Sequence, residues 1–447
     1  MKYFGTDGIR GAADSEWLSP PFVRRFGRAL AEHLREQQPH GLIHVVIGRD
    51  PRTSGQHIVR ALMQGLATDY IRICDCQVAP TPAIALAVKQ LNAAAGVVVT
   101  ASHNPASDNG LKLFAPGGVK WSEAAEAALE ARIDAIEEAP ERALPPAYLH
   151  DARRHYRQFA VDSFGTETLQ GYTIALDAAN GATALTTLEV LEELGARVFA
   201  IGVDPRGDNI NDGVGSEHPD RLVALVREHE ANLGIAHDGD GDRLVLVDDQ
   251  GKVVDGDALL GLLAQEMQAQ GRLKDDTLVI TTVSNLGLDL SLQEQGMNVV
   301  RTPVGDRHVF HAMREHGYTL GGENSGHLIV GDRLMTGDGL GAALEVLRIL
   351  VRTEKPLSQL VNTIELLPQQ KANLRVKEKI ALEQMPEFEA GVQELEQALN
   401  GEGRILVRYS GTEPKIRLLV EARDPARAEQ TLQALQELTA RHLEVVG

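Results

Sequence analysis

The sequence predicts an α/β protein with three similar α/β domains, mainly parallel sheets and a C-terminal α+β domain, arranged around a central cleft. The chain has 447 residues, too many for one core, because domains usually hold about 100–200 residues. Up to residue 366, apolar strand-like runs alternate with helical patterns, which is typical of parallel sheets covered by helices. Three of these runs end in an unusual polar loop. Because ligands bind beyond the carboxyl ends of strands in open α/β sheets, we expect one shared cleft.

The first α/β domain is expected to span residues 1–150. Apolar runs predict its strands and amphipathic runs predict its helices, with Ser122 as the N-cap of the last helix. The predicted strands are 42–48, 71–76 and 94–101, and the predicted helices are 54–67, 81–91 and 122–138. The segment RALPPAY (142–148) is predicted to be a linker, because paired prolines do not continue a helix.

The same alternation predicts a second domain at 151–253 and a third at 254–366. Their predicted strands are 172–182, 196–202, 231–237, 277–283, 298–304 and 318–322, and their predicted helices are 188–195, 219–229 and 255–267. After Leu367 the pattern changes to a polar helix, two short strands and a final helix, at 385–399, 404–410, 415–422 and 424–442. Residues 367–447 are therefore predicted to form a separate α+β domain.

Composition limits the function classes. The formal net charge of −19 disfavours nucleic acid and anionic membranes as partners. The two cysteines, Cys74 and Cys76, cannot build a disulfide framework. The N-terminus lacks the apolar core of a secretion signal, and no apolar run approaches the ~18 residues needed to cross a bilayer. We expect a cytoplasmic protein, monomeric or homodimeric, that acts on a small molecule.

The loop HDGDGDR (237–243) predicts a metal site. It supplies Asp238, Asp240 and Asp242 at alternate positions, and three carboxylates this close repel one another unless a cation lies between them. Ligation by oxygen alone favours Mg²⁺ or Ca²⁺ over zinc. An EF-hand does not fit, because Arg243 stands where that loop needs glycine. Mg²⁺ is favoured because three protein oxygens leave coordination positions for water and a phosphate.

The segment RYSGTEPKIR (408–417) predicts an anion site. Ser410, Gly411 and Thr412 offer two hydroxyls and backbone N–H groups in a tight turn. Arg408 and Arg417 flank this turn, and guanidinium groups bind phosphate through two parallel hydrogen bonds. Taken alone the segment is also consistent with a surface hairpin. Together with a metal loop, it points to a phosphorylated substrate.

Two further loops carry polar residues after predicted strands. GGENSGH (321–327) presents Glu323 and Ser325, which are suitable partners for sugar hydroxyls. TASHNP (100–105) presents Ser102 beside His103, and neighbouring residues that leave a strand are expected to point to opposite faces. His103 is therefore not predicted to deprotonate Ser102. Facing a metal triad and a phosphate clamp, Ser102 could instead carry a phosphoryl group, one oxygen of which would bind the metal.

TASHNP, DGDGDR, GGENSGH and RYSGTEP, in this order, resemble the four signature loops of the α-D-phosphohexomutases. The similarity extends over essentially the whole chain, and the segments YFGTDGIRG, GDNINDGVGS and VGDRHV resemble the branch that acts on glucosamine phosphates. The resemblance implies an isomerase that interconverts glucosamine 6-phosphate and glucosamine 1-phosphate through a phosphoserine enzyme and a 1,6-bisphosphate intermediate. It implies four domains around the cleft, Mg²⁺ as the cofactor and a sugar phosphate as the partner.

The resemblance also implies residue roles. Ser102 would be the phosphoserine and would bind Mg²⁺ together with the three aspartates, and Arg243 would lie near the seryl phosphate. Glu323 and Ser325 would hold sugar hydroxyls. The residues that would hold the non-reacting phosphate are Arg408, Ser410, Gly411, Thr412 and Arg417. Arg10 and Lys112 match positions near the reacting hydroxyl, and Lys112 is the candidate for acid or base catalysis.

One position departs from the related phosphomannomutase/phosphoglucomutase branch. There the loop that matches VGDRHV carries a histidine thought to assist proton transfer, whereas here the position is Asp306. His308 is out of register and is assigned no role. Three alternatives stay open from the sequence: a mutase for mannose or glucose phosphate, a Mg²⁺-dependent sugar phosphatase, and a non-catalytic sugar-phosphate binder.

Overall fold

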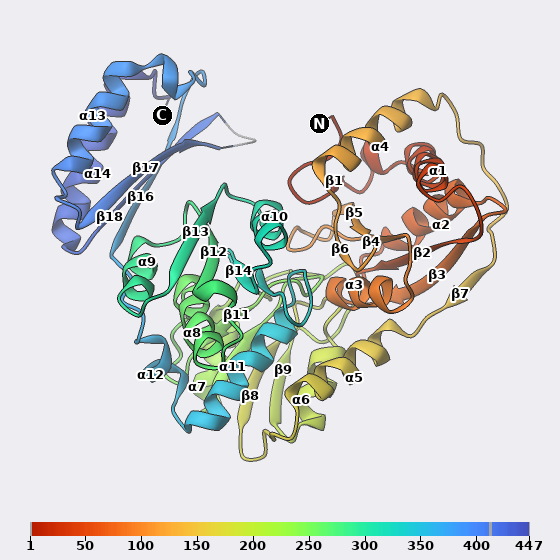
Figure 1. Ribbon diagram of the computed structural model, residues 1–447, viewed down its shortest axis with the longest axis horizontal. Coiled ribbons are helices and arrows are strands. Elements are labelled where there is room, and N and C mark those ends of the chain that lie inside the picture. The colour runs from red at the N-terminus through yellow and green to blue at the C-terminus, as the bar shows by residue number, and fades with distance from the viewer. Residues whose placement is uncertain (1, 411–413, 447) are drawn as a thin grey trace. The chain divides into compact units, whose positions relative to one another are not determined.

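The computed structural model describes residues 2–410 and 414–446. The chain divides into two compact units, the first formed by 1–282 with 299–363 and the second by 283–298 with 364–447. The first unit holds three α/β domains and the second holds an α+β domain (Figure 1). The three predicted α/β domains and the predicted α+β domain are thus confirmed. Among the described residues, no helix is long and apolar enough to cross a membrane.

The first domain is built on a mixed sheet with strand order β1-β5-β4-β2-β3-β7, with β6 paired to β5. Strands β4, β2, β3 and β7 run parallel, whereas β1 and β6 pair antiparallel with β5, and β5 is antiparallel to β4. The strands are β1 (Ile9–Ala12), β2 (Ile43–Arg49), β3 (Ile71–Val78), β4 (Ala95–Val99), β5 (Asp108–Ala115), β6 (Val119–Lys120) and β7 (Ala147–Leu149). The predicted linker therefore contains a short edge strand.

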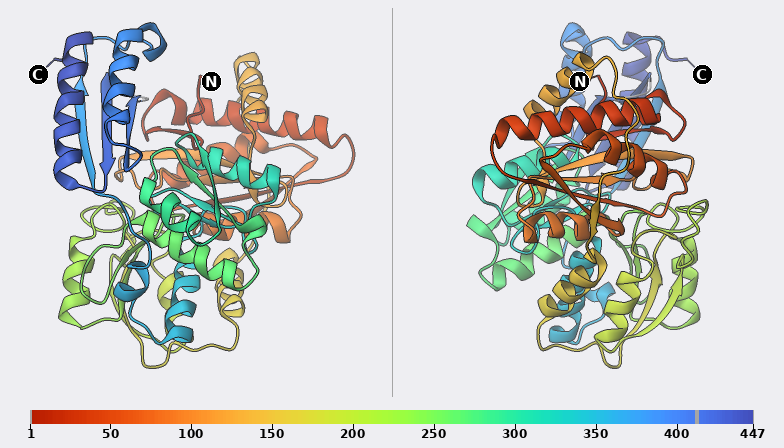
Figure 2. Two further views of the ribbon diagram at one scale, coloured as in Figure 1. Left: turned by 60° about the vertical axis from the view of Figure 1, so that its left-hand side comes forward. Right: turned by 90° about the vertical axis from the view of Figure 1, so that its right-hand side faces the viewer.

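Helices cover both faces of this sheet. Ile43, Val45 and Ile47 of β2 point into an apolar cluster with α1 and α2, and α1 extends along the sheet in the right-hand view of Figure 2. Gly48 faces Ile84 of α3 on the other side. This alternation follows from the twofold repeat of side chains along a strand. The helices are α1 (Pro20–Gln37), α2 (Gly55–Leu66), α3 (Thr81–Gln90) and α4 (Glu123–Ala135), with a 3₁₀ turn at Glu16–Leu18.

The second and third domains repeat a smaller version of this sheet. Their strand orders are β11-β10-β8-β9 and β13-β12-β14-β15. The second domain contains α5 (Ala152–Phe164), β8 (Thr173–Asp177), α6 (Thr186–Glu193), β9 (Arg197–Ile201), α7 (Asp220–Glu228), β10 (Leu233–Ala236) and β11 (Val245–Val247). The third contains α8 (Gly256–Ala269), a 3₁₀ turn (Lys274–Asp276), β12 (Thr277–Thr281), β13 (Asn298–Thr302), α10 (Asp306–His316), β14 (Leu320–Gly322), β15 (Leu328–Val330), α11 (Gly339–Thr353) and α12 (Leu357–Val361).

The three polar loops occupy equivalent places in the three sheets. Each follows a strand that runs parallel to its inner neighbour, β4, β10 or β14, and leads into an antiparallel partner, β5, β11 or β15. The loops span 100–107, 237–244 and 323–327. They are too short to contain a crossover helix, so the following strand must turn back antiparallel. The sequence patterns did not predict these returning strands.

The second unit holds the α+β domain, a three-stranded antiparallel sheet with order β16-β18-β17 and two helices that pack against it. Its elements are α9 (Leu286–Gln293), β16 (Gln369–Arg375), a 3₁₀ turn (Leu382–Gln384), α13 (Pro386–Gln397), β17 (Gly403–Tyr409), β18 (Lys415–Ala422) and α14 (Pro425–His442). Helix α9 was not expected here, because residues 283–298 are separated from the rest of the unit in sequence. Asn285 joins them, with its side chain hydrogen-bonded to both the N–H and the carbonyl of Leu367.

Candidate functional site

Ser102 lies buried in the loop between β4 and β5, in a left-handed backbone conformation with φ +53°. Its hydroxyl donates a hydrogen bond of 2.5 Å to Asp238 Oδ2, so the serine of the first domain meets the aspartate loop of the second. Gly239 makes this approach possible, because a Cβ there would lie 2.7 Å from the Ser102 carbonyl oxygen. The structure therefore brings the predicted serine and the predicted metal loop together.

A buried ion pair holds the serine loop from behind. Arg52 and Asp50 are fully buried and 2.9 Å apart. Arg52 donates to the carbonyl oxygens of Ser102, Asn104 and Asp108 at 3.0, 2.8 and 3.0 Å. Asp50 accepts from Thr100 Oγ1, which in turn accepts from the Ser102 N–H at 2.9 Å. These contacts fix the loop backbone independently of the Ser102 side chain.

The side chain of His103 does not point away from Ser102, as the sequence predicted. Its Nδ1 lies 3.3 Å from Ser102 Oγ, although adjacent residues were expected to point to opposite faces. The left-handed conformation of Ser102 breaks the alternation of an extended strand and turns the two side chains to the same side. Burial and the neighbouring Arg243 lower the pKa of His103 to about 4, so its imidazole is neutral at pH 7.

Asp238, Asp240 and Asp242 are all buried, and one carboxylate oxygen of each lies within 4.8 Å of the other two. Burial and the two neighbouring carboxylates raise the pKa of Asp238 well above its usual range. Asp238 Oδ1 accepts from the N–H groups of Gly241 and Arg243, and Asp240 Oδ2 accepts from Thr81 Oγ1 at 2.7 Å. The loop is thus held in place by its own backbone and by the start of α3.

The triad fits a divalent cation. Asp240 Oδ1 and Asp242 Oδ1 are buried and have no hydrogen-bond partner among the described residues, a costly arrangement for carboxylate oxygens. Three buried carboxylates at this spacing are the donor set that Mg²⁺ prefers. The residues that would hold the ion are the three aspartates, with Ser102 beside them.

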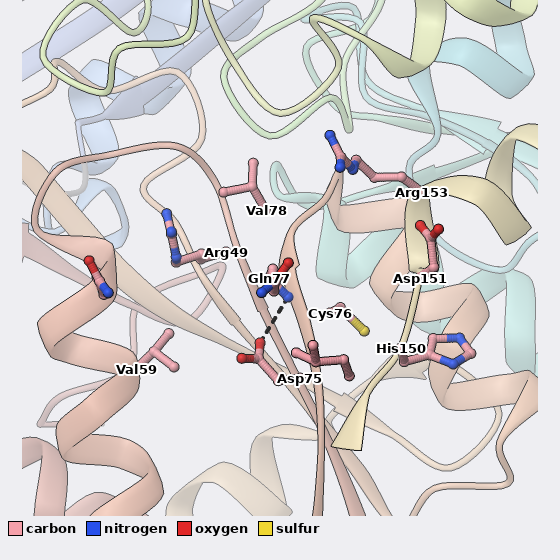
Figure 3. A pocket seen from close by; sticks show the side chains of 11 residues that line it. Arg49, Val59, Asp75, Cys76, Gln77, Val78, His150, Asp151 and Arg153 are labelled. Carbon is pink, nitrogen blue, oxygen red and sulfur yellow. Dashed lines mark hydrogen bonds between the residues drawn. The ribbon is translucent and has the colours of Figure 1, made fainter. Parts of the chain in front are cut away.

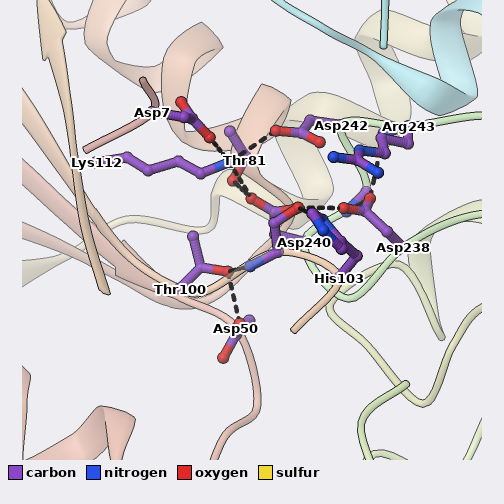
Figure 4. Close-up of polar contacts among 12 residues, drawn as sticks. Asp7, Asp50, Thr81, Thr100, His103, Lys112, Asp238, Asp240, Asp242 and Arg243 are labelled. Carbon is purple, nitrogen blue, oxygen red and sulfur yellow. Dashed lines mark hydrogen bonds and ion pairs between the residues drawn. The ribbon is translucent and has the colours of Figure 1, made fainter. Parts of the chain in front are cut away.

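Lys112 of β5 extends to the same carboxylates (Figure 4). Its Nζ lies 2.8 Å from Asp240 Oδ2, 2.7 Å from Asp242 Oδ2 and 2.9 Å from Asp7 Oδ2. Burial alone would lower the pKa of Lys112, but these three carboxylates outweigh it and hold the pKa well above its usual value. The ammonium group stays charged, so it can donate hydrogen bonds but is poorly suited to exchange a proton as an acid or a base.

The two predicted arginines near the serine are also at the site. Arg10 is partly buried and its Nη2 lies 2.5 Å from Asp7 Oδ2. Arg243 forms an ion pair of 3.0 Å with Glu217, and its backbone pairs with His327 of the third domain in an isolated antiparallel bridge. Burial alone would lower the pKa of Arg243, but Asp238 and Asp242 raise it. The guanidinium therefore lies in the electrostatic field of the triad.

Glu323 and Ser325 lie on the loop between β14 and β15. Glu323 is half-buried and its Oε1 accepts from the Gly305 N–H at 2.9 Å, whereas Ser325 is exposed. That contact ties the predicted sugar loop to the loop that begins α10. No hydrogen bond joins either side chain to the aspartate triad among the described residues.

The predicted phosphate clamp belongs to the second unit. Arg408 and Arg417 are paired directly across β17 and β18, and Arg417 Nη2 lies 3.4 Å from Ser410 Oγ. Burial and the charge of Arg417 lower the pKa of Arg408. Like charges directly opposite destabilise a sheet, so this pairing is expected where an anion binds. Gly411 and Thr412 lie outside the described residues.

Several residues at the site were given no role from the sequence, although Asp7, Asn211 and His327 lie within the quoted segments YFGTDGIRG, GDNINDGVGS and GGENSGH. Asn211 donates to the carbonyls of Ser102 and Asn104, both at 2.9 Å. Lys379 donates to the Ser410 carbonyl at 2.6 Å and adds a third cation beside the two arginines. The other residues that were not predicted are Asp7, Asp50, Arg52, Thr81, Lys120 and His327.

A cavity of about 600 Å³ lies away from these groups, beyond the carboxyl ends of β2, β3 and β7 (Figure 3). Arg49 and Arg153 line it together with Asp75 and Asp151, so its charges balance. None of the described residues predicted for the site lines this cavity. Volume alone therefore does not identify the site.

The chain matches the four domains of one family in order. Models of the phosphoglucomutase/phosphomannomutase family match at 1–140 (α/β/α domain I), 147–251 (α/β/α domain II), 255–366 (α/β/α domain III) and 372–438 (C-terminal domain). The chain belongs to this family, and it is an enzyme of the phosphohexomutase class. The predicted boundaries at residues 150, 253 and 366 stay predictions.

A curated relative indicates which branch of the family the chain resembles. The chain is 42% identical over 450 residues to the phosphoglucosamine mutase of Syntrophotalea carbinolica, an alignment that covers 99% of this chain and 98% of that protein. This likeness confirms the predicted family and favours a mutase over a phosphatase or a non-catalytic binder.

Solved structures share the fold. A phosphoglucomutase/phosphomannomutase family protein from Burkholderia thailandensis superposes with a TM-score of 0.82 at 24% identity, over 98% of both chains. The N-acetylphosphoglucosamine mutase of Aspergillus fumigatus, solved in complex with GlcNAc-6P and magnesium, gives 0.66 at 18% identity, over 98% of this chain and 96% of that one.

Proposed function

We propose that this protein interconverts glucosamine 6-phosphate and glucosamine 1-phosphate through a phosphorylated Ser102 and a 1,6-bisphosphate intermediate. The observation that carries the proposal is the buried Ser102 hydroxyl, 2.5 Å from a triad of carboxylates that has free oxygens. The preference for glucosamine rests on the relative from Syntrophotalea carbinolica. The family resemblance implies that the product, glucosamine 1-phosphate, serves the synthesis of activated amino sugars.

The proposed cofactor is Mg²⁺, held by Asp238, Asp240 and Asp242 with an oxygen of phosphorylated Ser102. When bound, the ion would withdraw charge from the phosphoryl oxygens and offset the mutual repulsion of the carboxylates. The magnesium in the Aspergillus fumigatus mutase supports this choice. Asp240 Oδ1, which is buried and has no hydrogen-bond partner among the described residues, supports it independently.

In the first half-reaction, the P–O bond to Ser102 breaks and a P–O bond to the free hydroxyl of the sugar monophosphate forms. The hydroxyl proton leaves the sugar, and Ser102 Oγ regains a proton, so atoms and charges balance. In the second half-reaction the bond between the other phosphoryl group and its sugar oxygen breaks, and a P–O bond to Ser102 Oγ forms. The serine proton is lost and the sugar oxygen gains one, which regenerates the phosphorylated enzyme. Lys112 and Arg10 would stabilise charge on the transferring group, since both are cations fixed beside the triad.

The remaining roles are proposed from the resemblance of these loops to the signature loops of the family. Glu323 and Ser325 would hold sugar hydroxyls, and Arg243 would contact the seryl phosphate. Arg408, Ser410 and Arg417 would hold the phosphate that does not react, together with Gly411 and Thr412. The same clamp must accept either phosphate of the bisphosphate, which a pair of guanidinium groups can do because they recognise phosphate and not the sugar.

The test is an assay of the purified protein with Mg²⁺ and the 1-phosphates of glucosamine, glucose and mannose, followed by ³¹P NMR. We expect conversion to the 6-phosphates, fastest for glucosamine, and stimulation by added 1,6-bisphosphate. Release of inorganic phosphate without isomerisation would identify a phosphatase. A clear preference for mannose or glucose phosphate would place the protein in another branch of the family.

A further inference from the structure

Lys120 is a buried cation beside the site that no part of the proposed mechanism uses. It ends the two-residue strand β6, which pairs antiparallel with β5, the strand that carries Lys112. Its side chain is 11% exposed. The ammonium group lies 2.7 Å from Asp7 Oδ1 and also contacts Asp306 Oδ2. Lys120 therefore joins the first domain to the first turn of α10 in the third.

The two carboxylate oxygens of Asp7 contact different cations. Oδ1 accepts from Lys120, whereas Oδ2 faces Lys112 at 2.9 Å and Arg10 at 2.5 Å. A carboxylate held through both oxygens cannot rotate about its Cβ–Cγ bond without breaking one of these contacts. The orientation of Asp7, and with it the placement of Lys112 and Arg10, thus depends on Lys120.

The contacts close into a ring of alternating acidic and basic side chains that spans three domains. Asp306 Oδ2 lies 3.4 Å from His327 Nε2, and His327 Nδ1 lies 3.6 Å from Asp242 Oδ1. Asp242 meets Lys112 at 2.7 Å. The ring runs Asp242, Lys112, Asp7, Lys120, Asp306, His327 and back to Asp242, and none of its side chains is more than 17% exposed.

We propose that Lys120 and Asp306 are positioning residues for the reacting centre. They fix the carboxylate of Asp7, which in turn holds Lys112 and Arg10 against the aspartate triad. Neither residue has a hydrogen bond or ion pair to Ser102 among the described residues, so both act through Asp7. This inference rests on the proposed mutase function, because it assigns Lys112 and Arg10 to the phosphoryl transfer.

The alternative is that Lys120 and Asp306 form an ion pair that only stabilises the contact between two domains. Substitutions can separate the two roles if the variants remain folded. Removing one partner of a buried pair leaves an uncompensated charge and strongly destabilises a protein, whereas replacing both by neutral groups of similar shape is often neutral. The double variant Lys120→Met/Asp306→Asn should therefore fold about as well as the wild type. Asp7 keeps two cationic partners in that variant, Lys112 and Arg10.

The experiment measures kcat, KM and the melting temperature of the double variant and of Asp306→Asn alone. We expect kcat to fall about ten- to a hundredfold in the double variant, with KM nearly unchanged, because small misplacements of catalytic groups cost this much. Asp306→Asn should also lower kcat with little change in KM, but by a smaller factor. Because Lys120 keeps Asp7 as a partner in this single variant, it also serves as the test if the double variant does not fold. The control is Arg272→Met/Glu345→Gln, which neutralises another ion pair and also removes contacts to Asp332, Arg333 and Arg348, and it should leave kcat unchanged.

Three outcomes are informative. If the wild type turns over glucosamine phosphates and the folded variants keep kcat within about twofold, the positioning role is wrong and the pair is structural. If kcat falls only in proportion to lost stability, as in an equally destabilised control, the positioning role is also wrong. If the wild type itself does not isomerise hexosamine phosphates, the proposed function fails before this inference is reached.

Discussion

Ser102 Oγ of the first domain and Asp238 Oδ2 of the second lie 2.5 Å apart, joined by a hydrogen bond that the serine donates. The two residues are 136 positions apart in the chain. Their loops meet because each leaves the carboxyl end of a buried strand, and because Gly239 leaves room for the Ser102 backbone. A serine in this position can carry a phosphoryl group directly against the proposed metal ligands.

Replacing Ser102 should separate chemistry from folding. Ser102→Ala is expected to abolish turnover, because the hydroxyl is the proposed carrier of the phosphoryl group. The melting temperature should change little, since Arg52 and Asn211 hold the loop through backbone carbonyls. Intact-mass analysis should find a phosphorylated fraction in the wild type and none in the variant. Retention of more than a few percent of the activity would contradict the carrier role.

Asp240→Asn should cost both activity and the response to metal. The change removes charge from the proposed Mg²⁺ site, so turnover should fall severely even at high Mg²⁺. Without metal, the melting temperature should fall slightly, because the Lys112 ammonium loses one of its three carboxylate partners. Differential scanning calorimetry with and without Mg²⁺ checks this. An unchanged Mg²⁺-induced rise in melting temperature would show that the triad does not bind the ion.

The sequence could predict the four loops because each one concentrates its chemistry in a few consecutive residues. Asp238, Asp240 and Asp242 share one turn, and Arg408 and Arg417 flank another. The strands before these loops were predictable from their apolar runs. The strand β5 after the first loop was not, because DNGLKLFA mixes polar and apolar residues without strict alternation.

The remaining site residues could not be predicted because only tertiary packing makes them neighbours. Asp7, Lys120 and Asp306 form contacts across 113 and 186 positions. Nothing in the quoted segments around Asp7 and Asp306 indicates that Lys120 lies between them. The orientation of His103 depended on the backbone angle of Ser102, which no side-chain pattern encodes. Chemistry carried by a few consecutive residues could thus be predicted from the sequence, whereas contacts between domains could be identified only in the structure.

Glu126 should make stability depend on pH. Burial raises its pKa from about 4.5 to about 7, although Arg307 opposes the rise. Between these two pH values the folded protein binds more protons than the unfolded chain, so stability present below pH 4.5 is lost as the pH rises through 7. The melting temperature of the wild type should therefore decline over this range on account of Glu126, and Glu126→Gln should reduce that decline.

The matched control for this pH effect is Glu123→Gln on the same helix. Glu123 also faces Arg307, at 3.4 Å, but its side chain is 59% exposed. Its replacement should leave the pH dependence of the melting temperature unchanged. Parallel curves for the wild type and Glu126→Gln would show that Glu126 titrates at its usual pKa.

The phosphate clamp should act on every hexose phosphate alike. A bidentate guanidinium contact to a charged group contributes about 1.5–3 kcal/mol, or roughly ten- to a hundredfold in affinity. Arg417→Ala should raise KM by about that factor for glucosamine 1-phosphate and glucose 1-phosphate together, leaving their ratio nearly constant. It should also stabilise the second unit slightly, because it removes the cross-strand repulsion with Arg408.

Substitutions elsewhere complete this test of substrate choice. Arg423→Ala removes an exposed arginine just beyond β18 and should leave KM unchanged for both sugars. Glu323→Gln should instead lower kcat/KM through the sugar contacts, with the largest loss for the preferred sugar, which we expect to be glucosamine. Steady-state kinetics with both substrates decide between these assignments. A change in the sugar ratio for Arg417→Ala, or an equal loss for both sugars in Glu323→Gln, would reverse the proposed division between phosphate and sugar recognition.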